Sequence, residues 1–454
     1  MFLRYKEKLF FMVLGDLAAM LTGFTMALAL GHRNPLDLDM ALSYRWGLVT
    51  LVIFTLLVFF ILDIYALYKM PERFLSQTTI IGLGLVLSAV LTTFTFFFSR
   101  HVVPRAVFIL FYLVSFVLIV LFRYVIARRT RSLIYWKALV IGDGERCQEA
   151  ARIIQSRKYL HAEVVGYLCD ERVAHVDGGA PYLGDVGNAL PVIEKEGVNQ
   201  VIIAAGKVDD GLKELLLECM KKKVKVSDSR KMIEEITGRV PISHLSDHWF
   251  ILELSAIDKR YFWYVKRFAD IAFSLFGLCL FVPLFPLAAL LIKLDSPGPV
   301  FYRQTRIGRR NRPFHAWKLR TMAKDADKNN VLWTTADDKR ITRTGQLLRK
   351  IRLDEVPQLI NVLKGEMSLI GPRPEAASLV ELYKKEIPYY LERHMVTPGV
   401  TGWAQINYRY GNSVEDARQK LMFDFYYIKK RSWVLDSMIF LRTIRTVLTG
   451  KGAL

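Results

Sequence analysis

The sequence predicts a three-part membrane protein: a bundle of four transmembrane helices in residues 1–130, a Rossmann-like α/β domain in 131–250, and a mainly α-helical monotopic domain with a re-entrant membrane helix in 251–454. Four apolar stretches lie before residue 130. Strand-like and helix-like patterns alternate through the middle of the chain. A fifth apolar stretch, at about 266–294, contains two prolines and has basic residues at both ends. The length of 454 residues also favours several domains over one core.

The four apolar stretches are each about 20 residues long, the length at which a helix crosses the hydrocarbon core of a membrane. They occupy residues 9–30, 46–67, 79–99 and 106–126. The first is too long for the apolar part of a cleaved signal peptide and lacks a clear small-residue cleavage site, so we expect it to stay attached. Basic residues precede the first stretch and follow the fourth, which predicts that both ends of the bundle face the cytoplasm.

Composition favours a membrane protein over a nucleic-acid binder. Hydrophobic residues make up 52% of the chain, and 63 Lys and Arg against 43 Asp and Glu leave a formal charge of +20. Basic clusters attract any polyphosphate, but the apolar content is wrong for a nucleic-acid-binding protein. We therefore expect membrane lipid and phosphorylated ligands as partners, and no nucleic acid. The four cysteines are scattered without paired spacing, which is typical of free thiols in a reducing cytoplasm.

The middle of the chain begins with a predicted βα unit. An apolar strand in "KALVIGDGERCQEAARII" turns through Gly142 and Gly144 into a helical pattern. Further strands are predicted in "AEVVGYLCD" and "VNQVIIAAG", with a helix between them that ends at Gly197. Such alternation predicts a parallel, Rossmann-like sheet. The phosphate-binding pattern G-x-G-x-x-G is incomplete because Cys147 replaces its third glycine, so two interpretations stay open: nucleotide binding, or a turn that only needs a positive φ.

The fifth apolar stretch differs from the first four because it contains Pro283 and Pro286 near its middle. Proline lacks an amide donor and clashes with the preceding turn, so the two prolines should bend or break the helix. Basic residues at both ends favour keeping both ends on the cytoplasmic side. A re-entrant helical hairpin satisfies both observations. The alternative is a fifth full span, which would place the rest of the chain outside the cell, away from cytosolic substrates.

Residues 296–454 contain dense patches of Gly, Pro, Arg and carboxylate, a composition typical of active sites. Arginine forks bind phosphate oxygens, and glycine or proline turns let a backbone approach a diphosphate closely, so a phosphorylated substrate is expected. Asp354 and Glu355 stand together among basic residues and precede a helical pattern. We expect the basic neighbours to lower the pKa of both carboxyls.

Two roles are open for this carboxylate pair. An ionised Asp354 can attack phosphorus, and a second carboxylate can hold a divalent metal that screens a diphosphate. If Asp354 begins the following helix, the helix N-terminus would also favour the approaching phosphate. The alternative is plain helix capping, because Asp is a preferred N-cap residue and Pro is tolerated in the first turn. The spacing alone weighs capping and catalysis equally.

As a whole, the segment 262–454 resembles the bacterial sugar transferase family, the monotopic polyprenyl-phosphate phosphoglycosyl transferases. The resemblance rests on the proline-broken apolar helix and on four motifs in family order: "SPGPVFYRQTRIG", "WKLRTM", "LDEVPQLINVLKGEMSLIGPRPE" and "PGVTGWAQIN". With its membrane bundle and Rossmann-like middle domain, the chain is similar to the long form of that family, as in undecaprenyl-phosphate glucose or galactose phosphotransferases and their exopolysaccharide-associated relatives.

The resemblance implies a two-step reaction at a bacterial inner membrane, on its cytoplasmic side. Asp354 attacks the β-phosphate of a UDP-sugar and expels UMP, and polyprenyl phosphate then takes the sugar phosphate from the aspartyl intermediate. It also implies a Mg²⁺ cofactor, held by Asp354 and Glu355. Further residues match motif positions implied in binding the diphosphate, the lipid phosphate or the nucleotide: Lys318, Arg320, Arg352, Arg373, Gln405 and Arg409.

Some details of the motifs leave alternatives open. Thr397 stands where the family often has an arginine, which bears on the expected uridine contacts, and Gln405 could equally brace its loop. The C-terminal aromatic and basic segment is compatible with an interfacial helix or with packing against the domain core. The identity of the sugar, the length of the carrier and the oligomeric state stay open, and a homodimer is compatible with the long form.

Two other kinds of protein compete with the transferase. A nucleotide-sugar dehydratase or epimerase would act through the middle domain, and it would need an intact glycine pattern and a Tyr-x-x-x-Lys pair. The glycine pattern is incomplete there, and residues 131–250 contain no Tyr-x-x-x-Lys pair. A membrane scaffold or polysaccharide sensor would have no use for the Asp-Glu pair or the Arg-Pro patches.

Overall fold

The computed structural model separates into two compact units, Met1–Ile236 and Thr237–Leu454. The predicted division into three domains stays a prediction. The structure describes residues 5–31, 44–62, 64–65, 74–98, 103–133, 136–156, 162–170, 180–206, 209–242, 245, 250, 260–323, 338, 340–408, 411 and 413–448.

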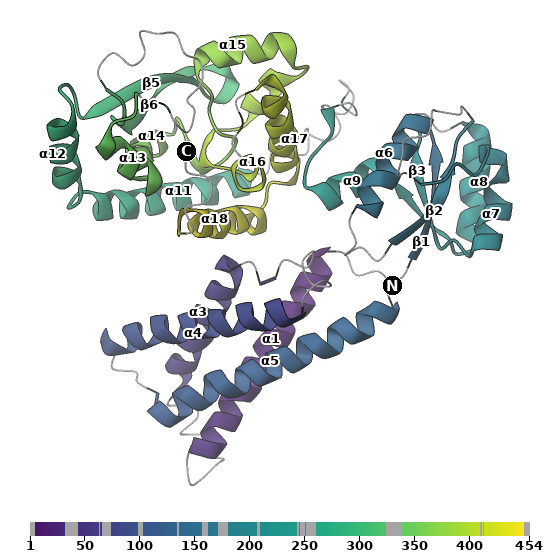
Figure 1. The fold of residues 1–454 in the computed structure, drawn as a ribbon, viewed down its shortest axis with the longest axis horizontal. Coiled ribbons are helices and arrows are strands. Elements are labelled where there is room, and N and C mark those ends of the chain that lie inside the picture. Colours follow the sequence, from purple (N-terminus) through teal and green to yellow (C-terminus); the bar gives the residue numbers. More distant parts are fainter. Residues whose placement is uncertain are drawn as a thin grey trace. The chain divides into compact units, whose positions relative to one another are not determined.

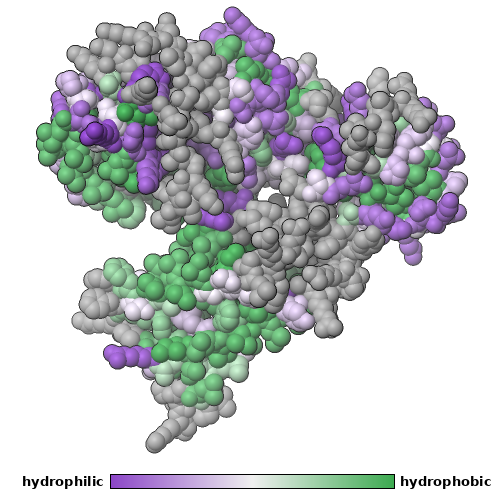
Figure 2. All heavy atoms as spheres, in the orientation of Figure 1, coloured by the Kyte–Doolittle hydropathy of each residue, from purple (hydrophilic) through white to green (hydrophobic). Residues whose placement is uncertain are grey.

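In the residues that the structure describes, the first unit opens with four apolar helices (Figure 1). They are α1 (Tyr5–Gly31), α3 (Arg45–Ile61), α4 (Phe74–Phe98) and α5 (Arg105–Leu133). Three contain a stretch long and apolar enough to cross a membrane, whereas α3 has only 17 residues. The membrane character of this region is therefore confirmed, and the number of four spans stays a prediction. Figure 2 shows apolar side chains gathered over these helices.

A parallel sheet with helices on both faces follows, as the alternating pattern predicts. Its strands run in the order β2-β1-β3-β4. They are β1 (Trp136–Gly142), β2 (Ala162–Leu168), β3 (Gln200–Ala204) and β4 (Lys225–Asp228). The helices are α6 (Gly144–Gln155), η3 (Val186–Asn188), α7 (Ala189–Glu196), α8 (Asp210–Lys221) and α9 (Ser229–Thr237). Buried side chains pack α6 and α9 on one face and α7 and α8 on the other. The Rossmann-like relationship of the sheet stays a prediction.

The second unit begins with the proline-broken stretch, which forms two helices, α11 (Arg260–Phe281) and α12 (Phe285–Asp295). Their axes differ by 62°. The helix break predicted from Pro283 and Pro286 is thus confirmed, because Pro283 lies in the turn between the helices and Pro286 lies in the first turn of α12, where its missing amide costs no hydrogen bond. Whether the bent pair re-enters the membrane or crosses it as one broken span stays a prediction.

Beyond the hairpin, the described residues of this unit form further helices and two small sheets. The strands are β5 (Phe301–Ile307) and β6 (Pro313–Leu319), which pair antiparallel, and β7 (Ser368–Ile370) and β8 (Gly399–Thr401), which pair parallel. The helices are η6 (Arg309–Asn311), α13 (Arg343–Lys350), η8 (Leu353–Glu355), α14 (Gln358–Lys364), α15 (Ala377–Glu386), η9 (Tyr390–Met395), α16 (Trp403–Asn407), α17 (Val414–Lys430) and α18 (Trp433–Leu448). The largest core lies among β7, α15, α16, α17 and α18.

Glycines allow the backbone after β7 to lie very close to the backbone at β8. A Cβ on Gly399 would lie 2.1 Å from the backbone nitrogen of Gly371, and a Cβ on Gly402 would lie 2.1 Å from the Gly371 carbonyl oxygen. Only glycine allows these segments to approach so closely. These motif glycines thus bring two backbone segments together, which fixes the loop that starts at Gly371.

The C-terminal helix α18 packs against the core through one face. Leu435 and Ile439 are buried there, and Asp436 accepts hydrogen bonds from Lys266 at 2.6 Å and from the Tyr427 hydroxyl at 3.0 Å. The core-packing interpretation is therefore confirmed for this face. Val434 on the same helix stays exposed, and an interfacial role for the exposed side stays a prediction.

Candidate active site

The structure brings together four of the predicted site residues from three separate segments. Lys318 lies near the end of β6, Asp354 and Glu355 lie in η8, and Arg373 follows β7. The Lys318 ammonium lies 3.2 Å from Oε1 of Glu355, and Arg373 Nη2 donates to the same oxygen at 2.5 Å. We call Lys318, Glu355 and Arg373 the cation clamp, because two cations hold one carboxylate.

A buried asparagine places the clamp lysine beside η8. Asn361 is fully buried in α14, the helix that follows η8. Its Oδ1 accepts the amide of Trp317 at 3.1 Å, and its Nδ2 donates to the His315 carbonyl at 2.8 Å. These two bonds tie α14 to β6 because they satisfy backbone groups of the strand. Lys318 follows Trp317 directly, so the same bonds bring it to Glu355.

Two further arginines hold the loop that carries Arg373. Arg393 Nη2 donates to the Arg373 carbonyl at 2.9 Å, and Arg306 Nη1 donates to the carbonyl of Pro374. Arg393 is itself buried against Asp424, at 2.7 Å. Arginine suits this task because its fork reaches several acceptors at once. Consecutive carbonyls of the loop are thereby fixed, which orients the Arg373 side chain toward Glu355.

Arg306, Arg393 and Asp424 are not among the site residues predicted from the sequence. One signal was present in the sequence: Asp424 is an acidic residue within the apolar run "LMFDFYYI", where a charge is costly unless it is paired. Arg306 and Arg393 lie in segments that contain other polar or charged residues and carry no such signal.

Burial and charge drive the two neighbouring carboxyls in opposite directions. Burial raises the pKa of Asp354, and the Glu355 charge raises it further. Burial would also raise the pKa of Glu355, but Arg373 and Lys318 hold it well below its usual range. The expectation that basic neighbours lower both values is therefore wrong for Asp354, because it lies buried beside a second carboxylate. Burial lowers the pKa of Lys318 to about 8, although Glu355 opposes the shift.

Asp354 itself is only 6% exposed, and its Oδ1 has no hydrogen-bond partner among the residues that the structure describes. A buried carboxylate oxygen without a hydrogen-bond partner is unusual in folded proteins, and it indicates that Asp354 has a functional role and does not stabilise the fold. Asp354 does not cap the following helix, because α14 begins at Gln358 and its N-cap residue is Pro357. For the same reason Asp354 does not begin α14, so the condition for a phosphate-binding helix N-terminus at this residue is not met. Arg352, two residues earlier, takes a left-handed backbone with φ 60°.

The other predicted binding residues lie differently. Arg320 is buried and donates to the carbonyls of Ser296 at 2.6 Å and Pro297 at 3.0 Å, just after α12. The structure thus joins Arg320 to the end of the hairpin rather than to the clamp. Gln405 donates to the Val400 carbonyl at 3.2 Å and so braces its loop. Arg409 lies outside the described residues. The substrate-binding roles of these residues stay predictions.

The carboxylate pair fits a hydrated divalent cation only in part. Magnesium is commonly held by one or two carboxylates together with substrate phosphates and water. Asp354 offers its unpaired Oδ1, whereas both Glu355 oxygens accept hydrogen bonds from the clamp cations. Among the residues that the structure describes, no cluster of three or more His, Cys, Asp or Glu side chains has a metal-binding arrangement. The fit therefore rests on Asp354.

The glycine turn after β1 offers a contrast. Gly142 has φ 144°, and a Cβ there would lie 2.5 Å from the Ala204 backbone, so this turn does require glycine. The Asp143 carboxylate that follows accepts the Gly206 amide at 2.9 Å and pairs with Arg146 at 3.0 Å. The turn interpretation is confirmed for Gly142. Nucleotide binding by this sheet stays a prediction.

Comparison with known proteins gives two family matches. A model described as "Bacterial sugar transferase" matches residues 261–450, and one described as "CoA-binding domain" matches residues 60–226. The first match contains all residues of the clamp and Asp354. The second extends from the membrane helices to β4 of the parallel sheet.

Several curated relatives are similar to the chain. It is 43% identical over 238 residues to the UDP-N-acetylgalactosamine-undecaprenyl-phosphate N-acetylgalactosaminephosphotransferase of Aeromonas hydrophila, covering 52% of this chain and 56% of that protein. It is 32% identical over 341 residues to the UDP-glucose:undecaprenyl-phosphate glucose-1-phosphate transferase of Xanthomonas campestris pv. campestris, covering 72% of this chain and 69% of that protein. The chain is also 40% identical over 223 residues to a protein of the same name from Escherichia coli (strain K12), and this match covers 49% of this chain and 46% of that protein.

Proposed function

Because this chain belongs to the bacterial sugar transferase family, we propose that it transfers a sugar 1-phosphate from a UDP-sugar to polyprenyl phosphate, releasing UMP and initiating an exopolysaccharide or another surface glycan. The names of the relatives support a UDP-sugar donor and an undecaprenyl-phosphate acceptor. The names of these relatives specify different sugars, so they do not identify the sugar of the UDP-sugar donor. The observation that carries the proposal is the buried Asp354, with an unpaired oxygen beside the clamp.

In the proposed first step, a carboxylate oxygen of Asp354 attacks the β-phosphorus of the UDP-sugar. The bond between this phosphorus and the oxygen that bridges to UMP breaks, and UMP leaves with the electron pair. In the second step, a phosphate oxygen of the polyprenyl phosphate attacks the same phosphorus. The bond to Asp354 breaks, the carboxylate is regenerated, and a polyprenyl-diphosphate sugar forms.

The clamp supplies positive charge where the diphosphate must lie. Lys318 and Arg373 are held in place by Glu355 before any substrate arrives, so little reorganisation is needed when charge develops on the leaving UMP. The raised pKa of Asp354 also makes its carboxylate a more basic nucleophile than a solvent-exposed one. Glu355 stays ionised because its pKa is low, and it thereby keeps both cations oriented.

We further propose that Mg²⁺ joins this site when the substrate is bound. Asp354 would hold it through the unpaired Oδ1, and substrate phosphates and water would complete its ligands. The ion would screen the diphosphate charge. Glu355 would act beside it through the clamp cations, because its own oxygens accept their hydrogen bonds.

The membrane arrangement forms part of the same proposal. The bend of 62° between α11 and α12 supports a re-entrant hairpin, which would hold the catalytic unit at the cytoplasmic face of the inner membrane. There a soluble UDP-sugar and a membrane-bound polyprenyl phosphate can meet. Four spans in the first unit, a Rossmann-like middle domain and a homodimer are compatible with this arrangement and stay predictions.

The test separates the two half-reactions. Purified protein in nanodiscs is incubated with Mg²⁺ and a panel of UDP-sugars, with and without undecaprenyl phosphate, and UMP release is measured. In a second arm without acceptor lipid, radiolabelled UMP is added to each UDP-sugar. We expect label to exchange into one UDP-sugar, because the aspartyl intermediate can return its phosphosugar to UMP.

The two arms have distinct outcomes. Lipid-dependent UMP release together with lipid-independent exchange supports transfer through a covalent intermediate. UMP release without any exchange contradicts the aspartyl intermediate and keeps the overall transfer. Neither release nor exchange with any UDP-sugar, in protein shown to be folded by thermal unfolding, contradicts the proposed reaction.

A further inference from the structure

A pocket of about 410 Å³ lies on the outer face of the sheet that β5 and β6 form. We call it the outer pocket, and its lining includes two cross-strand pairs and two residues at the end of α14: Arg303 and Trp317, Thr305 and His315, and Lys364 and Glu366. Successive side chains of a strand point to opposite faces. Lys318, which follows Trp317, therefore points to the other face, where it pairs with Glu355. A ligand in the outer pocket is thus separate from a substrate at the clamp.

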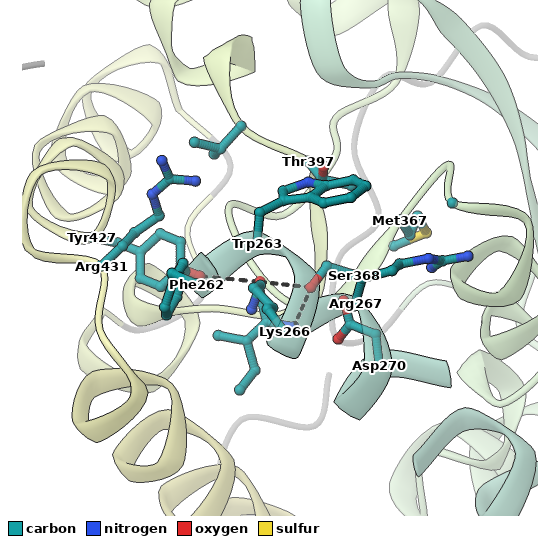
Figure 3. A pocket seen from close by; sticks show the side chains of 13 residues that line it. Phe262, Trp263, Lys266, Arg267, Asp270, Met367, Ser368, Thr397, Tyr427 and Arg431 are labelled. Carbon is teal, nitrogen blue, oxygen red and sulfur yellow. Dashed lines mark hydrogen bonds between the residues drawn. The ribbon is translucent and has the colours of Figure 1, made fainter. Parts of the chain in front are cut away.

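The pocket at the start of α11 shows what the outer pocket must be compared with (Figure 3). Two of its cations already bind groups of the protein. Lys266 pairs with Asp436 at 2.6 Å, and Arg267 donates to the carbonyls of Val362 and Leu363. Neither of these two cations is therefore available to a ligand.

The two cations of the outer pocket have no such partners. The Arg303 Cζ lies 3.8 Å from the centroid of the Trp317 ring, and the Lys364 Nζ lies 5.9 Å from it. Among the residues that the structure describes, neither side chain makes an ion pair or a hydrogen bond. Stacking on an aromatic ring uses the flat face of a guanidinium, so the N–H donors at its edge stay available to an anion.

Positive charge exceeds negative charge in the outer pocket. Glu366 is the carboxylate among its lining residues, and its Oε2 accepts a hydrogen bond from Asn361 Nδ2 at 2.7 Å. Arg303 and Lys364 are two like charges beside one ring, so an anion between them lowers the electrostatic energy. A phosphate group suits this place, because an arginine fork binds two of its oxygens and a lysine adds a mobile point charge.

The surroundings favour a soluble ligand over a membrane lipid. Both strands are fully described, and neither has an exposed large hydrophobic side chain, whereas Leu287 and Leu294 of α12 are exposed. The Thr305 hydroxyl and the His315 ring, with Oγ1 and Nδ1 3.3 Å apart, are exposed hydrogen-bonding groups. Such groups can bind the hydroxyls of a sugar. The volume of the outer pocket also falls within the range of small-molecule sites.

We propose that the outer pocket binds a small soluble phosphate ester that carries hydroxyl groups, the chemistry shared by sugar phosphates and nucleotides. Its phosphate lies between Arg303 and Lys364, and its hydroxyls face the polar side chains of β5 and β6. This site goes beyond the proposed transfer, because it lies on the opposite face of β6 from Lys318 and does not include Asp354.

Isothermal titration calorimetry measures this binding without any transfer, so its failure is distinct from failure of the proposed reaction. The full chain in phosphatidylcholine nanodiscs is titrated with glucose 6-phosphate, AMP and inorganic phosphate. We expect wild type to bind at least one ester more tightly than inorganic phosphate, because only the esters carry hydroxyls. Arg303→Gln and Lys364→Gln should each weaken this binding about tenfold, because each loses a charge-assisted contact.

Two further variants are the controls. Arg309→Gln removes an exposed arginine of η6 outside the outer pocket, and Arg373→Gln changes the clamp. Both should bind the ester as wild type does, with thermal unfolding as the check that every variant is folded. Loss of the two pocket cations alone should weaken the binding, and this result supports the proposal.

Four results would overturn the proposal. Wild type may bind neither ester more tightly than inorganic phosphate, or Arg303→Gln and Lys364→Gln may bind as tightly as Arg309→Gln. Weaker binding by Arg373→Gln would place the ester at the clamp. Loss of binding when phosphatidylglycerol is added to the nanodiscs would assign the outer pocket to a lipid head group.

Discussion

In the turn after β1 a carboxylate satisfies the protein's own backbone, whereas in η8 a carboxylate stays buried with an unpaired oxygen. Asp143 accepts the Gly206 amide and pairs with Arg146 in an exposed turn. Asp354 is buried, and two cations engage its neighbour Glu355 instead. Both turns combine an acidic residue with arginine. The comparison teaches that the proximity of charges in sequence matters less than whether the folded chain leaves an acceptor free for a ligand.

The largest expected difference comes from removing the two carboxylates in turn. Asp354→Asn should lower transfer by at least about a thousandfold, because the amide cannot act as the nucleophile. Asp143→Asn should change transfer by less than about twofold, because that turn makes no contact with substrate in the proposed reaction. Both are measured as UMP release with undecaprenyl phosphate in nanodiscs. Near-wild-type activity of Asp354→Asn would remove it as the nucleophile.

The clamp can be broken without touching Asp354. Glu355→Gln should reduce transfer by about a hundredfold, because Lys318 and Arg373 lose the charge that orients them and repel each other. Steady-state kinetics should show most of this loss in kcat. A thermal-unfolding scan serves as the control for folding. If kcat is unchanged and only KM rises, the clamp serves substrate binding alone.

The loop behind the clamp should have a smaller effect. Arg393→Lys removes the fork that reaches both Asp424 and the Arg373 carbonyl, and we expect about a tenfold loss of transfer. Arg146→Lys, in the turn after β1, is the matched control and should behave as wild type. Equal activities of the two variants would show that Arg393 does not orient Arg373 in a way that catalysis needs.

The pH dependence of transfer tests the clamp lysine. The pKa of Lys318 is about 8, so this side chain loses its positive charge as pH rises through 8. Transfer should therefore decline above about pH 8, approaching a tenfold fall per pH unit. In Lys318→Arg the cation persists, and the decline should move to higher pH, whatever the level of the maximal rate. An unmoved alkaline limb in this variant would assign the titration to another group.

The smallest expected effect concerns stability in the turn after β1. Asp143→Ala removes an exposed ion pair and one backbone hydrogen bond, so the free energy of unfolding should fall by only about 1 kcal/mol. Chemical denaturation followed by tryptophan fluorescence measures the change. A loss several times larger would show that the stability of the fold depends strongly on the Asp143 carboxylate.

Much of the architecture followed from patterns that are local in sequence. Apolar length identified the membrane helices, alternation identified the parallel sheet, and Pro283 and Pro286 located the helix break. In each case neighbouring residues supply the physical cause: uninterrupted apolar surface, the repeat of strand and helix, or a missing amide. The 17-residue α3 shows the limit, because apolar composition does not set where a helix ends.

The sequence by itself determined that Asp354 and Glu355 stand together within arginine-rich, glycine-rich motifs, and this was enough to indicate phosphate chemistry. Only the tertiary structure decided that Lys318 and Arg373 close on Glu355, that Arg320 joins the hairpin instead, and that the pKa of Asp354 rises. The reason is physical. Burial and pairing depend on segments such as β6 and β7, which are distant along the chain and meet only when the whole unit packs.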